Sequence, residues 1–289
     1  MKSIAFIGHV TKDKIGETYV PGGGVYYGSA AACAVLSPET VCTYTKCDAE
    51  SRSMYTTLLN SEFFETSTTT TFENVYPYPE NPDIRVSCIL DTAAAWTMED
   101  VNTIAEEKPS LSAIVLSPLF NGELPVDVLG HIRATFPQSV IGLDIQGYTR
   151  QRQPDNTINP ELPTDLSFLE SIDVLKVDNA EVALLTGMSL ETDLIERITL
   201  FHKRYPHLVI LCTCKDGVYT SIDEGETVAF EEWPQMPKDP HSRTGRGDTC
   251  MATFIASYVD TERDVTTSHK QCAILTSQKM QYKGPYRYE

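Results

Sequence analysis

The sequence lacks any long uninterrupted apolar run, and it has few basic residues for its size. The first absence argues against a transmembrane helix, which needs about 20 predominantly apolar residues. Lysine and arginine number 23 against 40 aspartates and glutamates, so the formal net charge is −17. Nucleic acids and anionic membranes attract basic surfaces, so neither is expected as a partner of this chain.

Several short signatures are absent as well. None of the eight cysteines belongs to a C-x-x-C pair or to a Cys/His cluster with zinc spacing. Reduced, buried thiols are therefore expected, as in a cytoplasmic protein. No G-x(4)-G-K-[ST] loop occurs, which excludes a P-loop kinase as far as sequence allows. The G-x-G-x-x-G that a dinucleotide-dependent oxidoreductase needs does not follow Gly8.

What the chain does have is an alternation of short apolar segments with amphipathic ones. Strands are predicted over residues 3–8, 40–45, 113–116, 140–144, 173–177, 208–213 and 218–222. Helices are predicted over residues 25–36, 51–60, 126–136, 180–186 (with Gly187 as C-cap), 190–204, 247–258 and 266–281. This order predicts an α/β fold, one domain over 1–289, with a mainly parallel central sheet flanked by helices. Such sheets bind ligands at the carboxyl ends of their strands.

One stretch breaks this alternation. Residues 66–71 are threonine-rich, and residues 72–90 carry Tyr-Pro-Tyr-Pro between two extended runs. The stretch is either a surface hairpin or a small β lid over a binding site, and we expect a lid contributed by about 14–21 and 66–91. An open lid edge could also pair with a second copy of the chain, which makes a homodimer conceivable.

The segment most suggestive of chemistry lies at residues 239–254. Its Thr244-Gly245-Arg246-Gly247-Asp248 run precedes an apolar helix. Glycines let the backbone turn so that its N–H groups approach a ligand, and the helix dipole adds positive potential there. Together they predict an anion hole for a transferring phosphoryl group, with Asp248 as the base for an acceptor hydroxyl. The plainer interpretation is a glycine-rich turn with Asp248 as a helix N-terminal carboxylate.

Several motifs in order along the chain resemble those of the PfkB carbohydrate kinases. Thr244–Thr249 resembles the D-[TP]-T-G-A-G-D signature, and Asp178–Gly187 resembles the N-x-x-E…L-T-G segment. Gly8 and Asp13, followed by the Pro21–Gly24 run, resemble the N-terminal motifs of the family. The resemblance spans nearly the whole chain and implies a three-layer ribokinase-like fold with a small β lid, ATP as phosphate donor and Mg²⁺.

The resemblance also implies roles for individual residues. The residues implied to act in phosphoryl transfer are Asp248, Gly245, Arg246 and Gly247. Those implied to bind a sugar or polyol are Asp13, Gly22, Gly23, Tyr27, Asp144 and Gln146. Those implied to bind the nucleotide are Asp178, Thr213, Lys215, Gly217 and Thr244, with Glu181 organising Mg²⁺. The D-x-Q-x-x-x-R stretch at 144–150 is similar to that of inositol-kinase-like members and points to a polyol such as an inositol.

Four departures from the family pattern affect the details. Asp178 stands at the asparagine of N-x-x-E, and Ser242 replaces the first aspartate of the C-terminal signature, which in many relatives supports a K⁺ site. Arg246 replaces a small residue, and Cys212-Thr213-Cys214 replaces T-x-G. A nucleoside kinase of the same fold, or a binding protein that has lost turnover, therefore remain alternatives to a polyol kinase.

Overall fold

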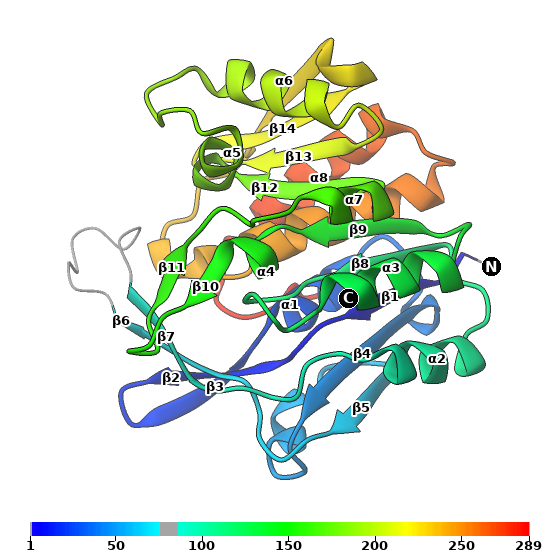
Figure 1. The fold of residues 1–289 in the computed structure, drawn as a ribbon, viewed down its shortest axis with the longest axis vertical. Helices are drawn as coiled ribbons and strands as arrows, with labels where there is room; N and C mark the ends of the chain where they lie inside the picture. The colour runs from blue at the N-terminus through cyan, green and yellow to red at the C-terminus, as the bar shows by residue number, and fades with distance from the viewer. Residues whose placement is uncertain (1, 76–85, 289) are drawn as a thin grey trace.

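The computed structural model describes residues 2–75 and 86–288 (Figure 1). Its central sheet has nine strands in the order β15-β14-β13-β12-β9-β8-β1-β4-β5. The strands are β1 Ile4–Ile7, β4 Val41–Cys47, β5 Ser61–Glu65, β8 Ala113–Leu116, β9 Val140–Asp144, β12 Val174–Asp178, β13 Val209–Thr213, β14 Gly217–Ile222 and β15 Thr227–Glu232. Neighbours from β5 to β13 are parallel, while β14 is antiparallel to both of its neighbours.

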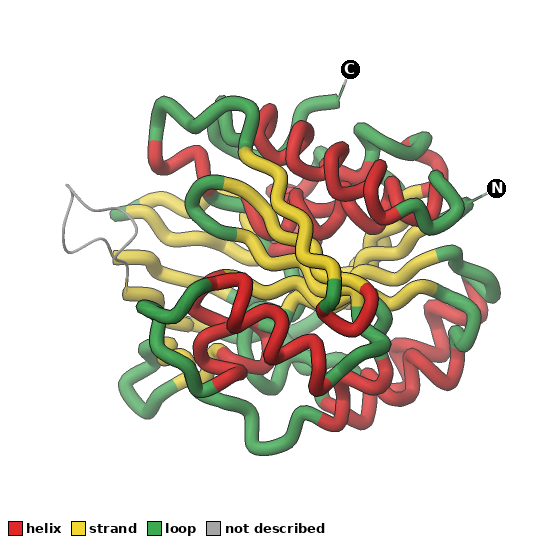
Figure 2. The backbone as a smooth tube through the Cα atoms, turned by 90° about the horizontal axis from the view of Figure 1, so that it is seen from above, coloured by secondary structure: helices red, strands yellow, loops and turns green. Residues whose placement is uncertain are grey.

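Helices cover both faces of this sheet, which gives three layers (Figure 2). One face carries α2 Met98–Glu107, α3 Val126–Thr135, α5 Asn179–Thr186 and α6 Leu194–Arg204. The other face carries α1 Gly24–Ala32, α7 Arg246–Asp260 and α8 Val265–Lys279. Each face has its own buried apolar cluster, because the side chains of a strand alternate between the two faces. The predicted three-layer α/β fold with a mainly parallel sheet is confirmed.

A second, smaller sheet has four strands in the order β3-β2-β6-β7. They are β2 Thr11–Ile15, β3 Thr18–Gly22, β6 Thr71–Val75 and β7 Val86–Asp91. Figure 1 shows this sheet beside one end of the central sheet, next to the short strands β10 Arg150–Arg152 and β11 Ile158–Pro160. The strands fall within or next to the two stretches in which the lid is expected. The Tyr-Pro-Tyr-Pro run lies outside the described residues.

Helix ends are marked by local signals. Asp178 caps α5 in a capping box with Glu181, and Gly187 ends the helix in the left-handed conformation, with φ of 70°. The C-cap at Gly187 is therefore confirmed. Helix α6 begins at Leu194 rather than near residue 190, because the Asp193 side chain accepts the first free amide protons of that helix.

Sequence patterns missed or misjudged some elements. The helix expected over 51–60 is a 3₁₀ helix at Ser51–Tyr55, followed by the edge strand β5. Helix α2 and strand β15 were not expected, since α2 shows little overall hydrophobicity and β15 is a largely exposed edge strand. None of the helices within residues 2–75 and 86–288 is long and apolar enough to cross a bilayer.

Candidate active site

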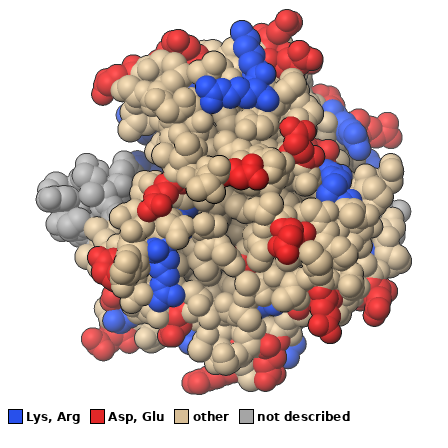
Figure 3. Space-filling view, viewed as in Figure 1, with Lys and Arg blue, Asp and Glu red and all other residues tan. Residues whose placement is uncertain are grey.

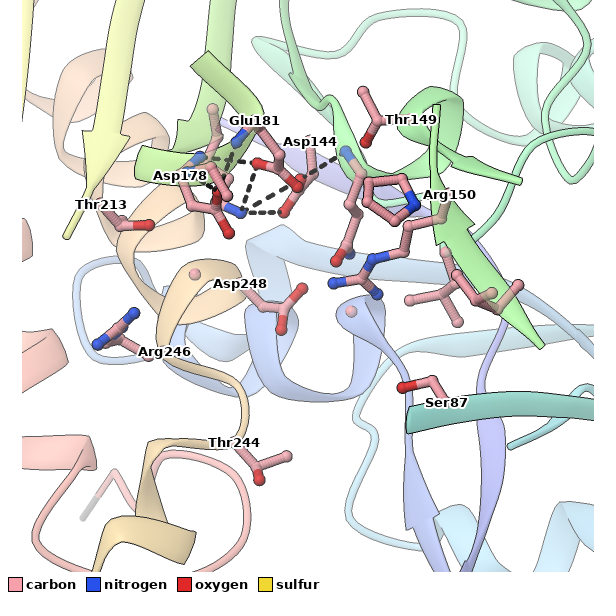
Figure 4. Close-up of a pocket in the computed structure, with 18 of the residues that line it drawn as sticks. Ser87, Asp144, Thr149, Arg150, Asp178, Glu181, Thr213, Thr244, Arg246 and Asp248 are labelled. Atoms are coloured by element: carbon pink, nitrogen blue, oxygen red, sulfur yellow. Dashed lines mark hydrogen bonds and ion pairs between the residues drawn. The ribbon is translucent and has the colours of Figure 1, made fainter. Parts of the chain in front are cut away.

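A cleft of about 880 Å³ lies at the carboxyl ends of β9, β12 and β13. The small sheet contributes Asp13, Asn74 and Ser87 to its wall, and the N-terminus of α7 contributes residues 243–248. Figure 4 shows Asp144, Asp178 and Glu181 gathered on one side of the cavity, with Arg150 on another and Asp248 between them. The cleft therefore brings together segments that are far apart in the sequence, at the edge where parallel sheets bind ligands.

The turn that opens α7 has the geometry of an anion hole. Gly245 is the N-cap, with φ of 80°, a conformation that favours glycine. A Cβ added there would lie 2.2 Å from the Tyr27 ring, so this ring and the glycine backbone are in direct contact. Gly245, Arg246 and Gly247 all line the cleft, and the first amides of α7 have no partners within the helix. The three residues expected to form the anion hole therefore lie in the cleft wall, and their role stays a prediction.

Asp248 lies in the first turn of α7 and faces the cleft. Its Oδ1 atom is buried, and the described residues supply no hydrogen-bond partner for it. Gly24 allows this approach, since a Cβ there would lie 2.7 Å from Oδ1. Burial, and next the negative charge of Asp144, raise the pKa of Asp248 to about 6, while Lys176 and Arg150 oppose the shift. A carboxylate with this pKa and one oxygen without a partner is suited to accept a proton near neutral pH.

The opposite wall holds a buried cluster of charges. The Lys176 ammonium lies 3.1 Å from Asp144 Oδ2 and 3.7 Å from Glu181 Oε2. Burial disfavours the charge of Lys176, but Asp144 and Glu181 outweigh this effect and raise its pKa above the ordinary value. Burial also raises the pKa of Glu181, against the attraction of Lys176. A Cβ at Gly247 would lie 3.0 Å from the Lys176 nitrogen, so this cation sits directly against the anion hole.

The residues expected to bind the acceptor are partly brought together. Asp13, Gly23, Tyr27, Asp144 and Gln146 line the cleft. Gly22 does not, but it faces Asp13, since a Cβ at Gly22 would lie 2.5 Å from Asp13 Oδ2. Gly22 thus leaves room for the Asp13 carboxylate, which is expected to bind the acceptor.

The residues expected to bind the nucleotide separate into two groups. Asp178, Thr213 and Thr244 line the cleft with Glu181. Lys215 and Gly217 are not in its lining: the Lys215 side chain is largely exposed beside Asp216, and Gly217 packs against Phe230. Lys215 belongs to the turn that joins β13 to β14 and Gly217 is the first residue of β14, both outside the described lining of the cleft, so their nucleotide-binding role stays a prediction.

The chemistry of the donor set is compatible with Mg²⁺ bound through substrate phosphates. Within the described part of the chain, no three or more His, Cys, Asp or Glu form a group that could hold a metal alone. Asp178 and Glu181 nevertheless both line the cleft, and Mg²⁺ is usually bound through one or two carboxylates plus phosphates and water. Their oxygens also accept the amide protons that start α5. The aspartate at 178 therefore has a structural role as an N-cap.

Sequence reasoning did not assign a role to four polar residues in the cleft wall. Lys176 interrupts the apolar Val-Leu-Lys-Val run of β12, and a lysine within a buried strand was a signal that could have been used. Arg150 ends the stretch quoted above and faces Asp248 across the cavity (Figure 4). Asn74 and Ser87 lie opposite each other on β6 and β7, where the Ser87 hydroxyl donates to Asn74 Oδ1 at 2.7 Å. Only strand pairing reveals this last pair.

Comparison with solved structures gives close matches over nearly the whole chain. A pyrophosphate-dependent kinase in the ribokinase family, complexed with a pyrophosphate analogue and myo-inositol, has 27% sequence identity and a TM-score of 0.81. That match covers 98% of this chain and 97% of the other. A pyrophosphate-dependent myo-inositol-1 kinase, converted into a myo-inositol-3 kinase by replacing one asparagine and one serine with leucine, has the same identity and TM-score. It covers 98% of this chain and 95% of the other.

A ribokinase from Arabidopsis thaliana, complexed with ribose and ATP, has 17% identity and a TM-score of 0.70. This match covers 99% of this chain and 95% of the ribokinase, and at this identity it shows the fold alone. No protein-family model matches the chain, and no curated protein matches it. The structural neighbours are thus ribokinase-family kinases, and the expected relationship to that family is confirmed.

Proposed function

We propose that this chain, a carbohydrate kinase of ribokinase-like fold, transfers a phosphoryl group to a hydroxyl of an inositol-like polyol, with Asp248 as the general base. The observation that carries the proposal is the buried Asp248 Oδ1 atom, for which the described residues supply no hydrogen-bond partner, beside the glycine-rich N-terminus of α7. A base and an anion hole within one helical turn of each other can act on the two ends of the same transfer.

Polar groups on both sides of the cleft suit a ligand with several hydroxyls. Asp13 approaches from the small sheet, while Asp144 and Gln146 approach from the end of β9. The neighbours crystallised with or acting on myo-inositol are also those most similar to this chain among the structures described above. An inositol is therefore a better candidate than a ribose or a nucleoside, which remain the alternatives of the same fold.

Pyrophosphate is the donor that the site supports best, in place of the ATP expected from sequence. The donor end of the cleft is cationic, with Lys176 against Gly247 and with Arg243 and Arg246 in the wall. The described lining takes nothing from β14, β15 or α8. ATP remains the second candidate, because Leu184, Met188 and Leu190 give the wall an apolar patch that could hold a base.

The mechanism follows from the arrangement of the side chains. Asp248 takes the proton of the attacking hydroxyl while the amides of residues 245–247 stabilise the transferring phosphoryl group. As the new O–P bond forms, the P–O bond to the rest of the donor breaks, and orthophosphate leaves from pyrophosphate or ADP from ATP. Lys176 adds positive charge at the same place, and Asp144 keeps that lysine protonated. Mg²⁺, when held by Asp178 and Glu181 together with the donor phosphates, would supply further neutralisation of phosphate charge. The small sheet would cover the acceptor and exclude water from the transfer.

The Asn74–Ser87 pair is the best candidate for choosing which hydroxyl reacts. It lines the acceptor end, and a neighbouring kinase changes its position of phosphorylation when one asparagine and one serine become leucine. Replacing both residues by leucine here should change the regiochemistry of the product, as read by phosphorus and proton NMR. An unchanged product would exclude this pair as the determinant.

The test of the function is a matrix of donors and acceptors. Pyrophosphate and Mg-ATP are each incubated with inositols, pentoses, hexoses and nucleosides, and the phosphorylated product is detected by mass spectrometry. Product from pyrophosphate and an inositol supports the full proposal, while product from ATP alone corrects the donor. No product in any combination, from protein that binds these compounds in calorimetry, would favour a binding protein without turnover.

A further inference from the structure

Lys279, the last residue of α8, is a buried cation that the mechanism above does not use. Its side chain is 0% exposed. The other two deeply buried lysines both have carboxylate partners, Lys46 with Asp100 at 2.6 Å and Lys176 with Asp144 at 3.1 Å. Among the described residues, Lys279 has no carboxylate within ion-pair distance. A buried ammonium without such a partner needs another source of stabilisation.

Backbone carbonyls and an aromatic face supply it. The Lys279 ammonium donates to the carbonyl oxygen of Ser242 at 2.8 Å and to that of Thr244. It also lies 5.2 Å from the centre of the Tyr27 ring, which is the distance of a cation–π contact. The Ser242 hydroxyl donates instead to the carbonyl oxygens of Asp239 and Met280. Carbonyl oxygens around a single positive charge are the surroundings that proteins give to alkali-metal ions.

These contacts end directly at the anion hole. The Thr244 carbonyl and the Gly245 N–H belong to one planar trans peptide, so they point in opposite directions. Holding that carbonyl fixes the direction of the Gly245 N–H, in a residue that lines the cleft. The Tyr27 ring contacts both Gly245 and the Lys279 ammonium. One charge therefore orients the turn that precedes α7.

We propose that Lys279 is a positioning residue that acts as a built-in monovalent cation of the anion hole, so that transfer needs no K⁺ or Na⁺. The proposal rests on the transfer reaction proposed above and names how its anion hole is kept in shape. Burial lowers the pKa of Lys279 to about 8, against the attraction of Asp248, so the ammonium is still mostly protonated at pH 7. The charge that the carbonyls require is thus present under ordinary conditions.

The first variant pair separates charge from volume. K279M keeps most of the volume and removes the charge, while K279A leaves a space lined by the two carbonyls and the Tyr27 ring. Misplacing a catalytic element by about 1 Å can lower a rate about 10²-fold, so we expect a loss of that order in both variants. K270A, at an exposed lysine on the same helix, is the control and should behave as the unsubstituted protein.

The deciding measurement is the response to cations. Turnover and thermal melting are followed in KCl, NH₄Cl and tetramethylammonium chloride at equal ionic strength. The unsubstituted protein should give the same values in all three salts. K279A should be stabilised and reactivated at least several-fold by K⁺ or NH₄⁺ but not by tetramethylammonium, which is too large for the space, and K279M should respond to none of them.

Other results would overturn the proposal. Activation of the unsubstituted protein by K⁺ would do so, as would full turnover of K279M in tetramethylammonium chloride. A K279A protein that melts at the same temperature in all three salts would also count against it. The melting comparison does not depend on turnover, so it decides on the cation role of Lys279 even if no acceptor is phosphorylated and the proposed function fails.

Discussion

Two aspartates of the cleft, one at the end of β9 and one in the first turn of α7, are in buried surroundings but differ in their partners. Asp144, at the end of β9, is 1% exposed and is paired with Lys176. Asp248, in the first turn of α7, has a buried oxygen without a partner and a raised pKa. The first carboxylate has a buried cation as its partner, whereas burial raises the pKa of the second to about 6.

The two carboxylates therefore differ in how far the folded state depends on them. A buried ion pair leaves an uncompensated charge when one partner is removed, so the β9–β12 wall is sensitive to substitution in its folding. A buried carboxylate oxygen without a hydrogen-bond partner costs stability, so its presence in the cleft favours a chemical role. The face of the molecule in Figure 3 carries more acidic than basic side chains, so cations inside the cleft have to offset a negative surface if an anionic donor is to bind.

The largest effect is expected from a substitution of Asp248, on α7. D248N should lower turnover by about 10²–10⁴-fold, because an amide cannot accept the hydroxyl proton. Its free energy of unfolding should not fall, since no partner of the buried Oδ1 is lost. Steady-state kinetics and urea denaturation measure the two quantities. D260N, at an exposed aspartate at the other end of the same helix, is the matched control, and near-normal turnover of D248N would refute the assignment.

The second largest effect is expected from a loss of the ion pair between Lys176 and Asp144. K176M should lower the free energy of unfolding by about 3–5 kcal/mol, because Asp144 is left buried without its cation. The double variant K176M/D144N should recover part of this loss, since it removes the uncompensated charge. Urea denaturation followed by circular dichroism provides the measurement. A K176M protein as stable as the unsubstituted one would mean that the two walls do not differ as described.

The pH dependence of turnover tests the role of Asp248 in the unsubstituted protein. Since the base acts in its ionised form and the pKa of Asp248 is raised to about 6, turnover should fall about tenfold per pH unit below that value and level off above it. Initial rates between pH 4.5 and 8, at saturating substrates, provide the profile. The residual rate of D248N should not show this step. A profile that stays flat down to pH 5 would place the catalytic proton on another group.

The smallest expected effect concerns the N-cap of α5. D178A should lower the free energy of unfolding by about 1 kcal/mol, because the amides of Ala180 and Glu181 lose their acceptor. D178N keeps an acceptor oxygen and should stay within a few tenths of a kcal/mol of the unsubstituted protein. Thermal and chemical denaturation distinguish these values. A larger loss in D178N than in D178A would show that the negative charge, rather than the cap, is what the position requires.

The part of the cleft wall formed by the turn that opens α7 could largely be predicted, because its residues are contiguous in the chain. Glycines 245 and 247, Asp248 and the apolar helix that follows are adjacent in the sequence, and backbone geometry relates them directly. Short apolar runs likewise predicted most of the central strands, since strands covered on both faces have few alternatives. The edge strands β5 and β15 and the helix α2 were missed, because their burial is partial and their pattern is weak.

The sequence by itself determined the class of fold and the residues of the α7 turn, because both follow from local pattern and from backbone preferences. The charge pairs of the site, in contrast, could be seen only in the tertiary structure. Lys176 meets Asp144 across the β9–β12 pairing, and Lys279 reaches Thr244 from the end of another helix. The physical reason is that burial and charge pairing depend on distances between segments remote in the chain, and these distances exist only once the sheet and its two layers of helices have assembled.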